Sequence, residues 1–279
     1  MPSMPSWNIH IAQTERLLER GGAVARTVRD ANAFLFGSLV PDIMVGYMVP
    51  GITDPIPYRQ THFAAPAFIP KPREREFWDT YVAPQFAQLT DADFGCAHVL
   101  PTSIEQEREA MDRIHFPQRF EGEAAADSAF ASASDAAHEP SDQRTLFDFL
   151  LGTWAHLLAD NLWNTRVNQF LDEHGGKPSE QFRIKKQGDF DGFGKMLPIS
   201  SIPRETPALV HAAQAFPQYA IARPHVHDAI VVTHEIVRTN GAPDHAPYQL
   251  LTDDFFEITF AEVLDTTEHA LEERLQLPL

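Results

Sequence analysis

The feature that most constrains the fold of this chain is a long apolar stretch in its middle. Residues 144–173 contain no proline, and the part from Leu150 to Asn164 carries Leu, Ala or Trp on nearly every side of a helix. A helix that is apolar all round is buried rather than placed on the surface. We therefore expect one buried central helix over residues 144–173, with the rest of the chain packed around it.

Two ionisable residues stand in the middle of this apolar stretch. His156 and Asp160 are four residues apart, so they project from one face of the helix, one turn above the other. A carboxylate rarely enters a core without a partner or a metal. The spacing leaves two interpretations open: a hydrogen-bonded pair inside the core, or a pair of metal ligands. Gly152, one turn before His156, would let another segment approach this face closely.

Apolar residues at helical spacing predict that the rest of the chain is also helical. The expected helices cover residues 8–20, 27–39, 74–89 with a bend at Pro84, 105–115, 207–216, 226–239 and 254–275. The second should end at Val40-Pro41, because the residue before a proline is pushed out of helical geometry, and Asp42 should then lie in a loop. Residues 43–72 and 174–205 are expected to be irregular or mixed.

The predicted fold class is all-α, a multi-helix bundle that forms a single domain over residues 1–279. Convincing alternating strands are scarce in the sequence. Residues 119–143 are rich in Ala, Ser, Asp and Glu, a composition that buries little apolar surface. We expect these residues to form a mobile surface insertion within the domain rather than a boundary between domains.

Composition limits the partners of the chain. Lys and Arg total 22 against 39 Asp and Glu, a formal charge of −17, which argues against binding nucleic acid or anionic lipid through a basic surface. Nucleic acid stays open as a substrate of a metal site, where the cation supplies the positive field. The single Cys96 excludes an intrachain disulfide and a cysteine-based zinc site. Without a signal-peptide pattern or a membrane span, a cytoplasmic protein is expected.

Imidazole and carboxylate residues elsewhere in the chain extend the pair in the central helix. His10 lies in the first expected helix, Asp42 follows Pro41, and His62 lies in a long loop. Imidazole and carboxylate without thiolate form the ligand set of catalytic zinc and related divalent sites. Each of these residues taken alone is more often a surface, cap or turn residue.

Four blocks of sequence contain the candidate residues. They are Asn8-Ile-His-Ile-Ala12, Phe34-Leu-Phe-Gly-Ser-Leu-Val-Pro-Asp42, Thr61-His-Phe63, and the stretch from Leu151 to Trp163 with its H-x-x-x-D pair. In these blocks and their order the chain resembles the small bacterial members of the zinc-dependent phospholipase C family, whose fold is shared with the fungal zinc nucleases. The resemblance covers residues 8–63 and 146–165 well and the remainder of the chain poorly.

The resemblance implies an all-α fold with a metal cluster between its helices. By position it implies five ligands, with the last as a bridging carboxylate: His10, Asp42, His62, His156 and Asp160. It further implies a hydrolase of small phosphoesters, in which one or two Zn²⁺ ions, or other divalent metals, polarise the phosphoryl group and activate the attacking water. A carboxylate, Asp42 or Asp160, would act as the general base.

The chain departs from the secreted phospholipases of that family at three places, one of which is that their His-x-x-x-Glu pair has no clear match here. Those enzymes use the amine of a processed N-terminal tryptophan as a ligand, whereas Trp7 follows six other residues here. They also have a further histidine near the place where Asn164 stands. The departures favour a site with one or two metals over a site with three.

Three further residues are candidates for completing the site. Asp189 and Asp191, in Gly188-Asp-Phe-Asp-Gly192, are candidate metal ligands, and the alternative is a turn with two solvated aspartates. Arg59, three residues before His62, is a candidate for holding a phosphate oxygen with both of its guanidinium arms. The alternative for Arg59 is an exposed loop arginine.

Two other functions stay open on the sequence. One is a relative that binds metal without hydrolysing a substrate and has a structural or partner-binding role. The other is an HD-type phosphohydrolase, which needs an adjacent His-Asp pair; His227-Asp228 is such a pair but lacks supporting ligands at suitable positions. His225, His227 and His234 are interpreted as surface or core histidines.

Overall fold

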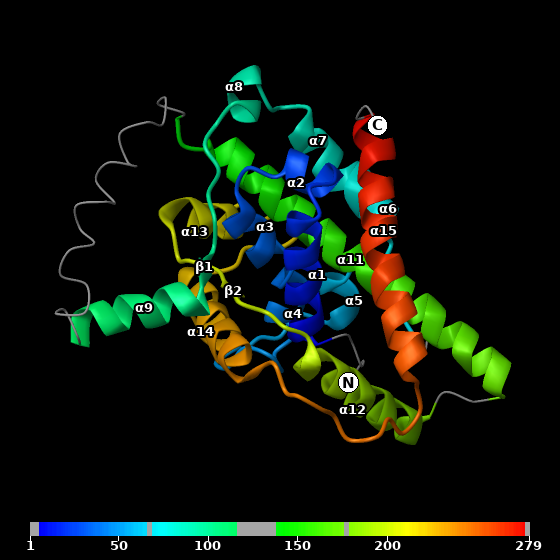
Figure 1. The fold of residues 1–279 in the computed structure, drawn as a ribbon. Helices are drawn as coiled ribbons and strands as arrows, with labels where there is room; N and C mark the ends of the chain where they lie inside the picture. The colour runs from blue at the N-terminus through cyan, green and yellow to red at the C-terminus, as the bar shows by residue number, and fades with distance from the viewer. Residues whose placement is uncertain (1–5, 66–68, 116–137, 176–178, 277–279) are drawn as a thin grey trace.

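The computed structural model of the chain describes residues 6–65, 69–115, 138–175 and 179–276, and its fold is all-α, as predicted (Figure 1). The helices are α1 (Trp7–Glu19), α2 (Ala23–Thr27), α3 (Ala31–Gly37), α4 (Val40–Ile43), α5 (Tyr58–Thr61), α6 (Glu74–Phe77), η1 (Trp78–Val82), α7 (Ala83–Phe86), α8 (Asp91–Phe94), α9 (Ile104–His115), α11 (Asp142–His174), α12 (Glu180–Met196), α13 (Pro207–Gln214), α14 (Arg223–Thr239) and α15 (Asp253–Leu275). Strands β1 (Thr102–Ser103) and β2 (Ser201–Ile202) pair antiparallel. No helix within the described ranges has both the length and the apolar character needed to cross a membrane.

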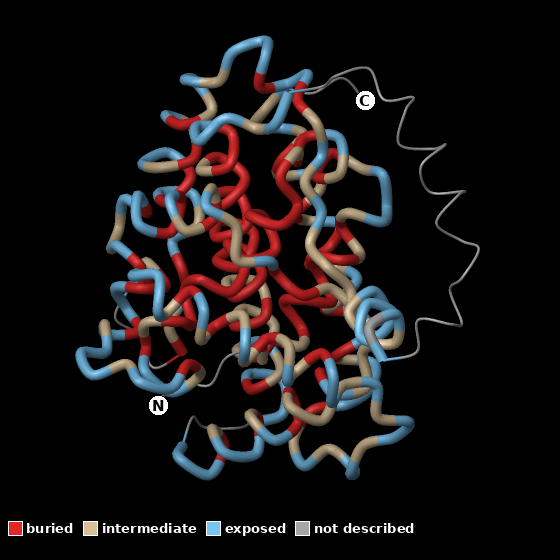
Figure 2. The backbone as a smooth tube through the Cα atoms, turned by 90° about the vertical axis from the view of Figure 1, so that its left-hand side faces the viewer, coloured by how far each residue is buried: buried red, intermediate tan, exposed pale blue. Residues whose placement is uncertain are grey.

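The central helix predicted for residues 144–173 is α11. It begins after Ser141, whose side chain accepts a hydrogen bond from the backbone N–H of Arg144, and ends at Gly175, whose φ of 68° is readily adopted only without a side chain. Every residue from Phe147 to Asp160 is buried. Helices α3, α13 and α15 pack against α11, and the buried backbone gathers at the centre of the molecule (Figure 2).

Helices α3 and α11 cross at a pair of glycines. A Cβ atom on Gly152 would lie 2.1 Å from the carbonyl oxygen of Phe34, and one on Gly37 would lie 2.1 Å from that of Phe149. At the same crossing the Thr153 hydroxyl donates a hydrogen bond to the carbonyl oxygen of Gly37, at 3.1 Å. The close approach expected at Gly152 is therefore confirmed, and α3 is the helix that makes it.

A buried polar network fixes the other end of α3 to α11. Asp30 caps α3 by accepting from the backbone N–H of Ala33 at 2.8 Å, and it also accepts from the Thr145 hydroxyl at 3.0 Å. Asp148 accepts from the backbone N–H of Asp30 and pairs with Arg144, whose Nε lies 2.9 Å away. Burial raises the pKa of Asp30 to about 6, because the charged carboxylate loses water and lies near Asp148.

The single helix expected over residues 27–39 is wrong, because the chain forms α2, α3 and α4 in succession. Asp30 ends the first stretch by capping the next helix. The expectation that Val40-Pro41 stops a helix is also wrong: both residues belong to α4, with Pro41 in its first turn. A proline is tolerated there because that N–H has no partner within the helix. Asp42 therefore lies in a helical turn and not in a loop.

The helix expected over residues 74–89 is present as three consecutive segments, α6, η1 and α7. The middle segment, Trp78–Val82, is π-helical. It stands directly before Pro84, which has no N–H for the carbonyl group four residues earlier. The bend expected at Pro84 thus takes the form of a widened turn.

Residues 174–205, expected to be mixed, contain helix α12 in their middle part. The Ser179 side chain caps α12 by accepting from the backbone N–H of Phe182, and Phe190 and Phe193 are buried in an apolar cluster with α11 and α15. A Cβ atom on Gly194 would lie 2.7 Å from Oγ of Ser6, so α12 also packs closely against the start of α1. Tertiary packing therefore outweighs the low helix propensity of the glycines.

The insertion expected at residues 119–143 lies largely outside the described residues. From Ser141 onward the chain belongs to the cap and the first turn of α11. The boundary of that expectation is therefore wrong at its C-terminal end, where the helix has already begun.

Candidate metal centre

The structure brings together the five ligands implied by the sequence. They come from four separate elements: α1, α4, the residue that follows α5, and α11. All are buried, with at most 2% of their surface exposed: His10, Asp42, His62, His156 and Asp160. Residues distant in the sequence thus meet at one face of the central helix.

Asp160 lies at the centre of this cluster. Its Oδ1 is 3.5 Å from Nε2 of His10, and its Oδ2 is 3.4 Å from Nε2 of His156 and 3.7 Å from Nε2 of His62. Nε2 of His62 also lies 3.3 Å from Oδ1 of Asp42. Each oxygen of Asp160 therefore faces a different part of the cluster.

The atoms that face one another have no hydrogen-bond partner. They are buried nitrogen and oxygen atoms: Nε2 of His10, His62 and His156, Oδ1 of Asp42, and both carboxylate oxygens of Asp160. Leaving a buried polar atom unpaired costs about 1–3 kcal/mol, so a set of six needs an explanation. The separations of 3.3–3.7 Å are close to the roughly 3.3 Å between two ligands of a tetrahedral ion with bonds of about 2.05 Å. The donor set fits a divalent cation such as Zn²⁺.

Hydrogen bonds on the far side of two rings fix which nitrogen faces the cluster with a lone pair. Nδ1 of His156 lies 2.7 Å from the carbonyl oxygen of Ser38, which only accepts, so this nitrogen carries the proton. Nδ1 of His62 lies 2.8 Å from Oγ1 of Thr61, whose own proton goes to the carbonyl oxygen of Tyr58. In the neutral form of each ring, Nε2 therefore offers a lone pair to the cluster, as metal-binding histidines do.

The glycine crossing described above also positions Ser38, whose carbonyl group accepts the Nδ1 proton of His156. Gly152 is one turn before His156 on α11, and it contacts α3 where that helix ends. Ser38 follows that end directly, and its hydroxyl donates to the carbonyl oxygen of Leu35. The carbonyl group of Ser38 is thereby held against the His156 ring.

A strained residue follows His62. Phe63 has a φ of 50°, a left-handed conformation that is uncommon for any residue other than glycine. Its carbonyl oxygen accepts from the backbone N–H of Arg73 at 3.1 Å, and the Arg73 guanidinium lies 4.8 Å from the centre of its ring. These contacts stabilise the turn that separates His62 from the following chain.

The charges of the cluster favour a neutral His10 and an ionised Asp160. Burial alone would raise the pKa of Asp160, but the neighbouring His156 and His10 outweigh it and lower that pKa below its usual range. Burial lowers the pKa of His10, and the nearby His156 lowers it further. The two imidazole rings stack with centres 3.9 Å apart, which disfavours charge on both. An anionic carboxylate beside a neutral imidazole is the state that binds a cation.

Two residues that the sequence analysis did not single out adjoin the cluster. The Tyr58 ring stacks on His62 with centres 3.8 Å apart, and their spacing of four residues was a signal that the sequence contained. Lys186 of α12 is buried; burial lowers its pKa to about 8, while the negative charge of Asp160 acts in the opposite direction. Nothing in the sequence indicated that this lysine would be buried.

Asp189 and Asp191 are not brought to the cluster. Both lie on α12 rather than in a turn, and neither belongs to a metal-binding grouping of the described residues. Asp189 accepts hydrogen bonds from the backbone N–H groups of Gln249, Leu250 and Leu251, at 2.7, 2.8 and 2.9 Å. It therefore fixes the segment that leads into α15.

The remaining candidates lie at the edge of the site or away from it. Arg59 is on α5, one turn before His62, and its side chain is exposed. Asn164, one turn after Asp160, donates to the carbonyl oxygen of Pro70 at 2.9 Å and is engaged there. His227 pairs with Glu205 at the surface, which does not favour an HD-type site.

We compared the chain with models of known protein families, with curated proteins and with solved structures, and found no match in any of the three. The case for a function therefore depends on the His/Asp cluster and on the sequence blocks that supply it.

Proposed function

We propose that the protein is a divalent-cation-dependent phosphoester hydrolase, with Zn²⁺ as the cation, related to the zinc-dependent phospholipase C family. The observation that carries the proposal is the set of six buried nitrogen and oxygen atoms that face one another without hydrogen bonds. The resemblance of four sequence blocks to that family supports it, because those blocks supply all five residues. A bound divalent cation would polarise a phosphoryl oxygen and lower the pKa of a water molecule.

The chain's ligands suit one cation or two. The groups that can hold an ion are His10, His156 and Asp160 on one side and Asp42, His62 and His156 on the other. His156 can serve only one ion, because its Nδ1 is held by Ser38. Asp160 has an oxygen directed to each side, so it is the residue proposed to bridge two positions.

Other groups of the chain are proposed to handle the proton and the substrate. Asp42 or Asp160, whichever keeps an oxygen free of the cation, takes the proton of the attacking water as general base. Arg59, exposed one turn before His62, holds a phosphate oxygen. Lys186, whose charge interacts with that of Asp160, adds a second positive group. These positive groups would attract a phosphoester anion in spite of the net charge of −17.

The test combines metal analysis with a generic phosphodiester assay on the full chain. We expect the purified protein to carry zinc and to hydrolyse bis(p-nitrophenyl) phosphate, with loss of activity in chelator and recovery on adding zinc. The His156→Ala variant should lose both metal and activity, whereas the matched His227→Ala variant, on the surface, should keep both. A wild-type chain that takes up no divalent metal would overturn the site itself.

A second function is favoured by the depth of the cluster. Its five residues are at most 2% exposed and tie together α1, α4, α5 and α11, as a structural metal would. In that case metal would raise the thermal midpoint while every phosphoester tested stays intact. Metal uptake with chelator-sensitive hydrolysis would decide for the enzyme.

A further inference from the structure

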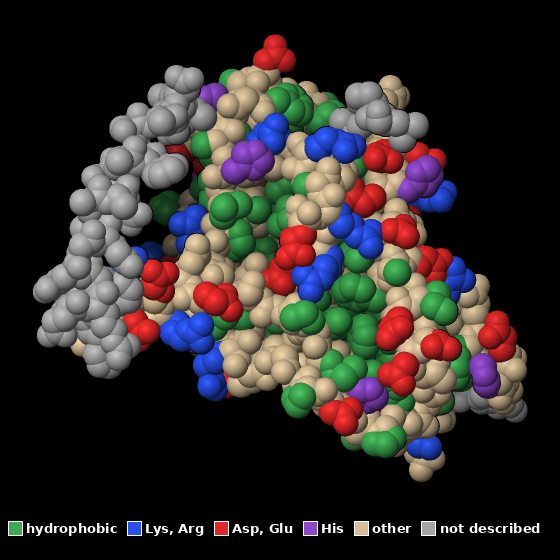
Figure 3. All heavy atoms as spheres, viewed as in Figure 1, with side chains coloured by type: hydrophobic (Ala, Val, Ile, Leu, Met, Phe, Trp, Pro, Cys, Tyr) green, Lys and Arg blue, Asp and Glu red, His purple; other side chains and the backbone are tan. Residues whose placement is uncertain are grey.

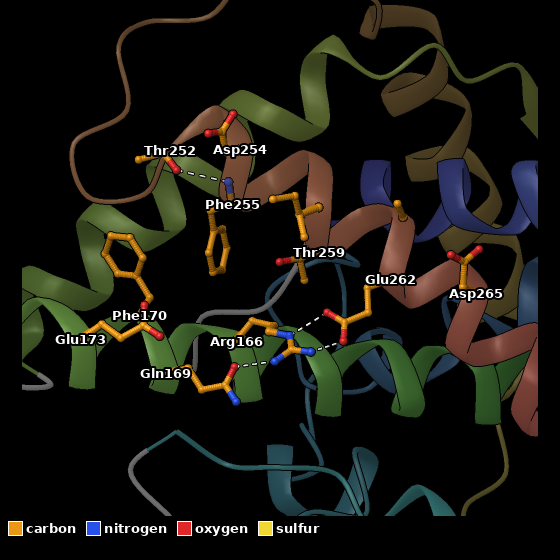
Figure 4. Close-up of a pocket in the computed structure, with 12 residues that line it drawn as sticks. Arg166, Gln169, Phe170, Glu173, Thr252, Asp254, Phe255, Thr259, Glu262 and Asp265 are labelled. Carbon is orange, nitrogen blue, oxygen red and sulfur yellow. Dashed lines mark hydrogen bonds and ion pairs between the residues drawn. The ribbon is translucent and has the colours of Figure 1, made fainter.

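A groove runs between the C-terminal part of α11 and the first half of α15, on a different part of α11 from the metal ligands (Figure 4). Its volume is about 780 Å³. The rings of Phe170 and Phe255 face the space between the two helices, with centres 5.8 Å apart. Ile258 also lines the groove and is 67% exposed, which is unusual for an isoleucine. The groove thus offers apolar surface to an occupant.

The charged residues of this groove are mostly acidic. Four carboxylates line it against a single cation, and two of the four are already paired: Glu262 with Arg166, and Asp265 with Arg20. In the described parts of the chain, no cation forms an ion pair with the other two, Glu173 and Asp254. Figure 3 shows acidic side chains gathered with hydrophobic ones over α15. The groove therefore suits an apolar side chain flanked by positive charge.

The chain itself carries a segment of that kind at the start of α12. Ile184 is 58% exposed and stands between Arg183 and Lys185. Lys185 is exposed and forms no ion pair with another described residue, while Arg183 pairs with Glu180 at the surface, a weak interaction. In a chain with 22 basic and 39 acidic residues, this is a rare basic and apolar surface.

We propose that the start of α12 from a second copy of the chain docks into the groove between α11 and α15. The two complementary surfaces are neighbours on one molecule, because Leu171 of α11, Phe182 of α12 and Phe255 of α15 belong to one apolar cluster. Each copy can therefore offer its α12 to the groove of the other at the same time. The result is a closed dimer with two-fold symmetry, in which Ile184 meets Ile258 and Lys185 meets Glu173.

Sedimentation velocity and light scattering on the full chain test this proposal. We expect a mass of twice the 31.3 kDa of one chain at high concentration, and dissociation on dilution or in high salt. Ile184→Glu and Ile258→Glu should each weaken dimerisation at least tenfold. Val231→Glu, which replaces another exposed aliphatic residue on α14, should leave it unchanged.

A charge exchange provides a test that does not depend on loss of folding. Lys185→Glu and Glu173→Lys should each weaken the dimer, and the double variant should restore it, because the ion pair is rebuilt with opposite polarity. A wild-type chain that stays monomeric over the whole concentration range overturns the proposal. A dimer that survives both isoleucine substitutions overturns it as well, because its interface then lies elsewhere. Circular dichroism confirms that each variant keeps its helices.

Discussion

Nδ1 of His156 lies 2.7 Å from the carbonyl oxygen of Ser38, one helical turn beyond the point where Gly152 touches α3. The close contact of two helices and the orientation of a candidate ligand are therefore one structural arrangement. A change that separates α3 from α11 should disturb the metal site even though it touches no ligand.

Gly152→Ala is expected to show this coupling. The new Cβ would lie 2.1 Å from the backbone oxygen of Phe34, so the helices must separate, at a cost of about 1–3 kcal/mol or more in the free energy of unfolding. Zinc affinity should fall as well, because the Ser38 carbonyl moves away from His156. Urea denaturation and zinc titration measure the two effects.

The matched control is Gly188→Ala on α12, where a Cβ would meet nothing within 4 Å. This variant should gain roughly 0.5–1 kcal/mol, because alanine favours a helix over glycine. Equal stability of the two variants would contradict the role assigned to the crossing.

Thr61→Val should weaken zinc binding without unfolding the chain. The substitution removes the oxygen that accepts the Nδ1 proton of His62, and loss of such a partner typically costs about 10–100-fold in metal affinity. Competition with a chromogenic chelator gives the affinity. Thr267→Val, which removes a buried hydroxyl of α15 that donates to Val263, serves as the control and should leave the affinity unchanged. An unaltered affinity in Thr61→Val would argue against His62 as a ligand.

Asp189→Ala separates the two roles considered for this residue. We expect a loss of about 1–3 kcal/mol in stability, because three backbone N–H groups at residues 249–251 lose their acceptor. The zinc content per chain should stay that of the wild type. Asp191→Ala removes a carboxylate that accepts from Gln187 alone among the described residues, and it should have a smaller effect on stability. A loss of zinc in either variant would restore that residue as a candidate ligand.

Asp30 should make stability depend on pH. Its folded pKa of about 6 lies above the usual value of 3.8, so protonation favours the folded state. The protonated Asp30 contributes roughly 3 kcal/mol to the free energy of unfolding below about pH 3.8. This contribution is lost as the pH rises through about 6. Asp30→Asn keeps an acceptor for Ala33 but does not titrate. The stability of the wild type relative to this variant should therefore decrease between pH 4 and pH 7, as measured by denaturation at each pH. A difference that is independent of pH would contradict the assignment.

The central helix and the five candidate ligands were predictable from the sequence for different reasons. Helix α11 was predictable because an apolar stretch without proline has few alternatives to a buried helix. The candidate ligands His10, Asp42 and His62 were not indicated by their own spacing. They became candidates only through the order of the sequence blocks, and the structure places them around Asp160.

What the sequence did not predict depends on contacts between distant residues. Helix α12 contains Gly188, Gly192 and Gly194, which favour a turn locally, yet aromatic packing against α11 and α15 makes this stretch helical. The structural role of Asp189 was not predictable, because the partners of its carboxylate lie far along the chain, at residues 249–251. Helix α4 was missed because Pro41 was taken to end a helix when it begins one.

The wide separation in sequence between His10 and Asp160 would have a consequence for how the chain takes up the proposed cation. Apart from His156 and Asp160, these residues are far apart along the unfolded chain, so only the folded chain offers the complete site. If zinc is the cation, as proposed, free zinc would shift the folding equilibrium toward the native state by mass action, increasingly so above its dissociation constant. Zinc supply would in that way set how much of this protein is folded, as well as whether it is active.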